Sequence, residues 1–100
     1  MAKPVFSIEK DKSGVLLQVK GELSVQHARE AKRIFQQASD EAADVHLQLL
    51  DVTSFDISAV QLTYLLRAEV QRQGHQFKIT LPQDASLLDV IEKCGITKII

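Results

Sequence analysis

Alternating apolar and polar residues mark four short segments of the chain as strands: 5–9, 15–20, 45–50 and 76–81. An alternation of this kind places every second side chain on one face of a sheet. In the second segment Val15, Leu17 and Val19 would share the core face. Residues 11–14 between the first two segments end in Gly14 and predict a hairpin turn. Residues 21–23 are expected to leave the sheet, and 96–100 are apolar enough for a short last strand.

Apolar residues at spacings of three and four mark the helices. The first helix is predicted behind Ser24 as N-cap, with a stripe of small and apolar residues at Ala28, Ala31, Phe35, Ala38 and Ala42. The second covers 57–73 and ends at Gly74. Its buried face is expected at Ala59, Leu62, Leu66 and Val70, with Leu65 beside them. A short third helix over 84–94, capped by Asp84, is closed by Gly95.

The order of elements is therefore ββαβαβα, with a further strand at the end. Two strand–helix–strand crossovers predict a partly parallel sheet with helices on one face or both. One hundred residues suffice for one modest core, so we expect a single α/β domain over 1–100.

The polar segment 51–56, between the third strand and the second helix, is where we expect a site. Asp56 is the predicted N-cap, which places Ile57 and Ser58 in the first turn, near free N–H groups and the positive end of the helix dipole. A phosphoryl group on Ser58 would gain these donors but lie close to Asp56 and Asp51. A partner packed over the turn would meet nearly two added negative charges, which describes a docking switch. The alternative is that Ser58 is a small polar residue tolerated in a first turn.

Composition argues against several functional classes. The net charge is −1 and the basic residues are dispersed, which disfavours nucleic acid and anionic membrane surfaces as partners. No apolar run approaches the length of a membrane span or of a signal peptide, so the default expectation is a cytoplasmic protein without membrane insertion. Cys94 is the single cysteine and is interpreted as a buried structural thiol.

The residues that could carry catalysis are scattered. His27, His46 and His75 lie on separate predicted elements without ligand spacing, so no metal or other cofactor is expected. There is no glycine-rich phosphate loop, and Ser58 lacks the glycines of a nucleophile elbow. Asp51 at a strand end is the position of a phospho-acceptor in receiver domains, but residues 9–11 run into a hairpin, which is the wrong topology. We therefore predict a protein that is not an enzyme.

Several short motifs, in this order and spacing, resemble the STAS domain, the family of sulfate-transporter tails and anti-sigma-factor antagonists. They are Val-Lys-Gly-Glu-Leu at 19–23, Leu-Gln-Leu-Leu-Asp-Val at 47–52, Phe-Asp-Ile-Ser-Ala-Val-Gln-Leu at 55–62, and the closing segment 88–96. The family pattern at the second long helix is Asp, two small hydroxyl residues and Gly. Asp56 matches the Asp and Ser58 the phosphorylated hydroxyl, whereas Ile57 replaces the first hydroxyl and Ala59 stands where Gly is usual.

The resemblance implies a four- to five-stranded mixed sheet with about three to four helices. It also implies a non-catalytic regulator, in partner-switching or chemotaxis-linked signalling, that binds an anti-sigma-factor-like serine kinase, is released by phosphorylation at Ser58 and is reset by a phosphatase. The docking surface it implies consists of Thr53, Ser54, Asp56, Ile57, Ser58, Ala59, Gln61, Tyr64 and Arg67. The alternative is a constitutive docking subunit of a transporter or other assembly, without phosphorylation. A small-ligand binder or cryptic enzyme is a further, disfavoured class.

Overall fold

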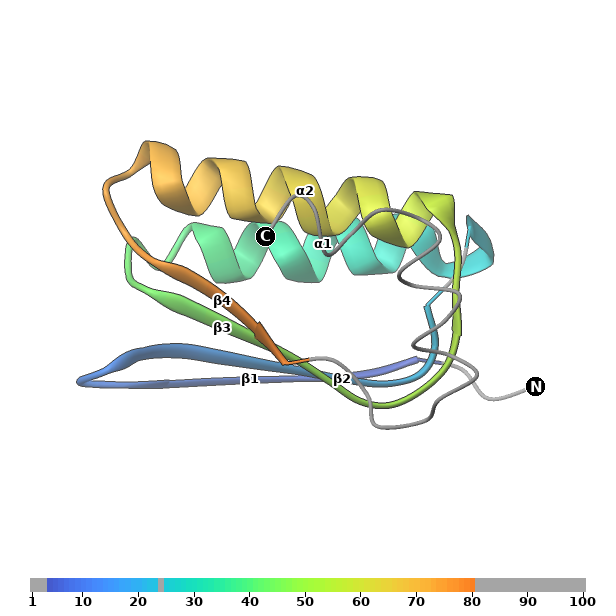
Figure 1. The fold of residues 1–100 in the computed structure, drawn as a ribbon. Coiled ribbons are helices and arrows are strands. Elements are labelled where there is room, and N and C mark those ends of the chain that lie inside the picture. The colour runs from blue at the N-terminus through green and yellow to red at the C-terminus, as the bar shows by residue number, and fades with distance from the viewer. Residues whose placement is uncertain (1–3, 24, 81–100) are drawn as a thin grey trace.

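The computed structural model describes residues 4–23 and 25–80. Its elements are β1 (Val5–Asp11), β2 (Gly14–Leu23), the 3-10 turn η1 (Val25–His27), α1 (Ala28–Ser39), β3 (Val45–Phe55), α2 (Ile57–Arg72) and β4 (Phe77–Thr80) (Figure 1). The predicted cap Ser24, the third helix with Cys94 and the last strand lie outside the described residues.

The four strands form one mixed sheet in the order β1-β2-β3-β4. β1 is antiparallel to β2, and β2, β3 and β4 are parallel to one another. The predicted hairpin is confirmed, because Asp11 pairs with Gly14 across a two-residue turn. The backbone N–H and the hydroxyl of Ser13 both donate to Asp11 Oδ1, at 2.8 and 2.6 Å, and these bonds fix the turn.

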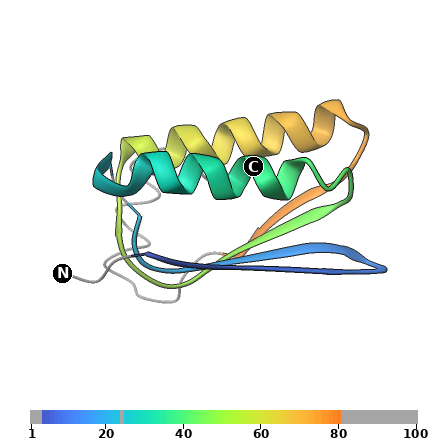
Figure 2. The ribbon, with the colours of Figure 1, turned by 180° about the vertical axis from the view of Figure 1, so that it is seen from behind.

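Both helices cover the same face of the sheet and run parallel to each other (Figures 1 and 2). Successive crossovers between adjacent parallel strands share one hand, so each helix returns over the same side. The core lies between the two layers. Its members on β2 and β3 include the residues that the alternation predicted: Val15, Leu17, Val19, Val45, Leu47 and Leu49. Leu23 and Val52, from the strand ends beyond the predicted segments, join them. The helices contribute Ala31, Phe35, Ala38, Ala59, Val60, Leu66 and Val70.

Two strand ends differ from the prediction. β3 continues through the segment expected to be a polar turn and stops at Phe55, and β2 keeps 21–23 within the sheet. The pairing explains the difference: Val19 pairs with Leu49 but Gly21 with Val52, so β3 carries an extra residue there, and a second register shift follows at once. Such bulges break the two-residue alternation from which strands are recognised.

The helices also differ in detail. α1 begins at Ala28 and ends at Ser39, so Ala42 lies beyond it, with a positive φ of 52°. Leu65, predicted beside the core, is 58% exposed. The buried stripe of α2 instead includes Thr63, whose hydroxyl donates to the Ala59 carbonyl at 2.8 Å. That bond satisfies the hydroxyl inside the core, and a stripe centred on Thr63 turns Leu65 toward solvent.

Candidate docking site at the start of helix α2

Asp56 holds the first turn of α2 in place. Its backbone is extended, and its Oδ1 accepts the Ala59 N–H at 3.1 Å. Its carbonyl accepts the Val60 N–H, also at 3.1 Å. The predicted N-cap is therefore confirmed, and Ile57 and Ser58 occupy the first turn.

Ser58 lies half-exposed at the second position of the helix. Over the described part of the chain, its hydroxyl makes no hydrogen bond. Ile57 beside it is 60% exposed, although it is a large aliphatic residue. The first turn thus offers a hydroxyl together with an apolar side chain, both accessible from outside.

The other predicted contact residues divide into three groups. Gln61 and Tyr64 are exposed and Arg67 is half-buried, and their role as contacts stays a prediction. Ala59 is 1% exposed and packs in the core, so its side chain is not part of the surface, which corrects that prediction. Thr53 and Ser54 lie in β3 rather than in a turn, and their role as contacts stays a prediction.

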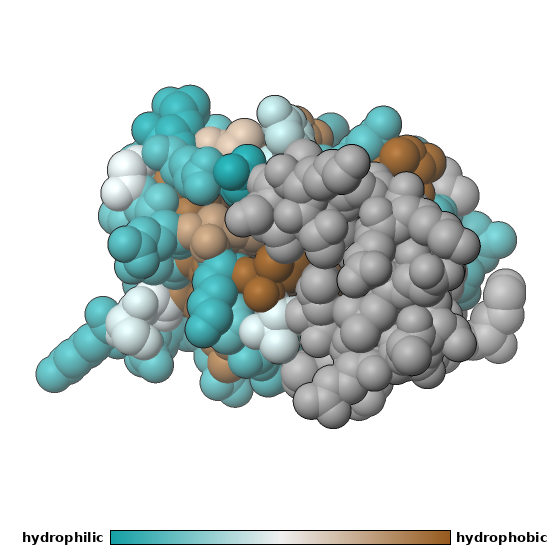
Figure 3. Space-filling view, viewed as in Figure 1, coloured by the Kyte–Doolittle hydropathy of each residue, from teal (hydrophilic) through white to brown (hydrophobic). Residues whose placement is uncertain are grey.

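Exposed residues of α2 form a largely apolar stripe along its outer side, interrupted by one glutamine, which we call the outward stripe: Ile57, Gln61, Tyr64, Leu65 and Ala68. Of the four large apolar side chains that are exposed in the described residues, three belong to it. Figure 3 shows apolar surface over the end at which α2 begins. Exposed apolar surface on a helix whose buried face is also apolar is typical of a protein–protein contact.

The described residues hold no cluster of three metal-ligating side chains, and no helix among them is long and apolar enough to cross a membrane. The three histidines have separate neighbours: His27 lies near Glu22, His46 near Thr80 and His75 near Asp44.

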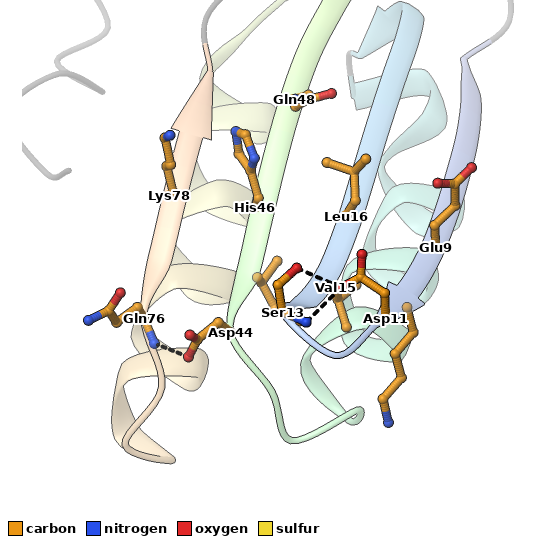
Figure 4. A pocket seen from close by; sticks show the side chains of 13 residues that line it. Glu9, Asp11, Ser13, Val15, Leu16, Asp44, His46, Gln48, Gln76 and Lys78 are labelled. Atoms are coloured by element: carbon orange, nitrogen blue, oxygen red, sulfur yellow. Dashed lines mark hydrogen bonds between the residues drawn. The ribbon is translucent and has the colours of Figure 1, made fainter.

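The face of the sheet opposite the two helices carries mostly polar side chains in rows that cross all four strands. One row consists of Glu9, Leu16, His46 and Lys78, which pair in register and border a shallow cavity of about 450 Å³ (Figure 4). His46 Nε2 lies 2.7 Å from Thr80 Oγ1. Partial burial, and secondarily the charge of Lys78, lower the pKa of His46 from its usual 6.5.

This lowered pKa predicts a pH dependence of stability. The unfolded chain takes up a proton at His46 near pH 6.5 while the folded chain still resists it. We therefore expect the free energy of unfolding to decrease as the pH falls from about 7 to about 5, and to decrease less in His46→Gln. Urea unfolding at several pH values measures both slopes. Equal slopes in the two proteins would show that His46 does not contribute.

The sequence matches no protein-family model and no curated protein. Solved structures do match the fold. A STAS-domain anti-sigma-factor antagonist from Rhodobacter sphaeroides is 20% identical, with a TM-score of 0.63 over 77% of this chain and 85% of that one. The anti-sigma-factor antagonist SpoIIAA in its unphosphorylated form is 16% identical, with a TM-score of 0.73 over 94% of this chain and 84% of that one. An anti-sigma-factor antagonist from Mycobacterium paratuberculosis is 14% identical, with a TM-score of 0.72 over 96% and 81%.

The chain has a STAS-type fold. The similarity lies in the fold, because the identities are low. The predicted mixed sheet of a STAS domain is confirmed, with four strands. The described residues hold two α-helices and one 3-10 turn, fewer than the three to four helices expected. Sequence reasoning assigned Leu65 to the core of this STAS fold. The buried stripe of α2 is centred on the polar Thr63. A threonine can occupy the core when its hydroxyl donates to the carbonyl one turn earlier, here that of Ala59, and this possibility was the signal against a buried Leu65.

Proposed function

We propose that this STAS-type chain is a non-catalytic regulator of the anti-sigma-factor antagonist type. It binds an anti-sigma-factor-like serine kinase through the start and the outward stripe of α2, and phosphorylation of Ser58 releases it. The observation that carries the proposal is the accessible Ser58 hydroxyl, without a hydrogen-bond partner in the described residues, next to the exposed Ile57 in the first turn of α2. The solved structures with this fold include three anti-sigma-factor antagonists, which supports the class of partner.

The physical basis of the switch is charge at an apolar contact. In the unmodified chain a partner covers Ile57 and Tyr64 and gains the burial of their exposed surface. A phosphoryl group on Ser58 brings close to two negative charges into that contact, beside the carboxylate of Asp56. The phosphoryl group itself is stabilised by the free N–H groups of the first turn, whereas the apolar surface of the partner no longer matches the charged site. A phosphatase then restores binding, and we place the exchange in the cytoplasm, where ATP is available.

Mass spectrometry tests the proposal directly. The chain is incubated with ATP and any anti-sigma-factor-like serine kinase found to be encoded near its gene, and the intact mass is measured. We expect a gain of one phosphate in the unmodified chain and no gain in Ser58→Ala. Ser13→Ala, at an exposed serine of the β1–β2 turn, serves as the matched control and should gain the phosphate. A stable complex without any mass gain would contradict the switch and support the constitutive docking subunit instead.

A further inference from the structure

A small groove runs between α1 and α2 on the outer surface of the helix layer. It encloses about 70 Å³, with Phe35, Leu62, Leu65 and Leu66 as its apolar part and Lys32, Gln36, Ser39 and Glu69 around them. Leu65 belongs both to this groove and to the outward stripe. The groove therefore continues the proposed docking surface toward α1 and is the point where an inserted side chain would meet both helices.

Ser58 lies at the N-terminal end of α2, on the side of the helix that lines the groove. Ser58, Leu62, Leu65 and Glu69 follow one another at spacings of four, three and four, so they lie on one side of the helix. Because α1 and α2 run parallel, this side of α2 faces α1 along its length (Figure 2). A group added to Ser58 therefore lies in line with anything seated in the groove.

The helix layer is positively charged in a protein of net charge −1. α1 and α2 together carry five cationic side chains and two carboxylates: Arg29, Lys32, Arg33, Arg67 and Arg72 against Glu30 and Glu69. Glu69 is already engaged, since hydrogen bonds from Arg72 and then Gln73 lower its pKa to about 2. In the described residues no ion pair is found for Arg29, Lys32 or Arg33, and all three are exposed.

We propose that the groove docks an acidic amphipathic helix of the partner, with an apolar side chain against Leu65 and acidic side chains toward Lys32, Arg29 and Arg33. A helix laid in a groove between two helices supplies anchors at spacings of three and four, and flanking charges of opposite sign fix its orientation. The identity of this helix as part of the kinase rests on the proposed function. The phosphate on Ser58 would then act by repulsion, because it adds negative charge at one end of a groove that selects negative charge.

The test uses two synthetic probes. One is a hydrocarbon-stapled helix of about 18 residues with leucines at spacings of three and four and acidic residues elsewhere, and the other has every acid replaced by lysine. Each is titrated into the isotope-labelled full chain and followed by NMR. We expect the acidic helix to shift the backbone signals of Lys32, Gln36 and Leu65, and to bind at least about 10-fold more tightly than the lysine helix at low salt.

Variants locate the contact. Leu65→Gln should weaken the acidic helix about 10-fold, because one buried aliphatic anchor is lost. Val5→Thr, at an equally exposed apolar residue on β1, should leave binding unchanged. Lys32→Glu combined with Arg33→Glu should reverse the preference between the two probes. Ser58→Glu should weaken the acidic helix and leave the lysine helix unaffected or tighter.

Several results would overturn the proposal. They are equal binding of the two probes, signal shifts confined to the sheet face opposite the helices, no effect of Leu65→Gln, or a chain that sedimentation shows to be a dimer and Leu65→Gln makes monomeric. The last would assign the groove to a second copy. The two proposals fail separately: phosphorylation of Ser58 without probe binding rejects only the groove, and probe binding without a mass gain rejects only the switch.

Discussion

Ser58→Glu is expected to weaken the proposed complex with a serine kinase about 100-fold, or ~2.7 kcal/mol, while Ser58→Ala leaves its affinity within about threefold. The glutamate places a permanent charge beside the exposed Ile57, at a contact that gains its free energy from apolar burial. The added carboxylate also lies near the carboxylate of Asp56, and the first turn of α2 contains no cationic side chain that could neutralise it. The alanine removes a hydroxyl that makes no hydrogen bond in the described residues.

Isothermal titration with a non-hydrolysable ATP analogue measures these affinities without phosphorylation. Gln71→Glu is the matched control, since it adds the same charge to an exposed position in the last turn of α2, about 20 Å further along the helix. Affinity should be nearly unchanged there. Equal losses in Ser58→Glu and Gln71→Glu would show that net charge, rather than position, weakens the complex.

Gly14→Ala is expected to lower the free energy of unfolding by about 3 kcal/mol, a large part of the stability of a small domain. Gly14 has φ +132°, and an added Cβ would lie 2.4 Å from the carbonyl oxygen of Asp44. That same oxygen accepts the Val15 N–H at 2.7 Å, where β2 and β3 begin their parallel pairing. The methyl group therefore strains the backbone and pushes on a hydrogen bond of the sheet at the same time.

Gly74→Ala provides the comparison. Gly74 also has a positive φ, +85°, but its added Cβ would meet nothing within 4 Å. Only the conformational strain remains, about 1 kcal/mol. Urea unfolding of the three proteins gives both differences. Equal costs at the two glycines would mean that the contact with Asp44 relaxes without loss.

The parts of the fold that follow local rules could be predicted from the sequence. The alternation in β2 and β3 identified the core residues, because one face of each strand is buried and the other is polar. α2 was placed to within one residue, since Asp56 caps its start and Gly74 follows its last turn. The position of Ser58 in the first turn, and with it the candidate site, follows from that cap alone.

What could not be predicted depends on contacts between distant segments. The bulges of β3 are defined by its pairing with β2, where Gly21 pairs with Val52. The sequence alone does not show this pairing, so the end of the strand was predicted to be a turn. The exposure of Leu65 depends on which side of α2 rests on the sheet, and an apolar residue on the outer side looks the same in sequence as one in the core. The groove with α1 is likewise set by how the two helices pack together.

The cap at Asp56 determines how a form phosphorylated at Ser58, as proposed, would differ from the unmodified chain. Its bonds to Ala59 and Val60 are made before any modification, and Ser58 Oγ is not among the atoms that hold the turn together. A phosphate added to Ser58, as proposed, would therefore break no hydrogen bond of the turn, and the backbone would keep its conformation. A receptor would then distinguish the two forms by the electric potential at the surface, whose range shortens as ionic strength rises.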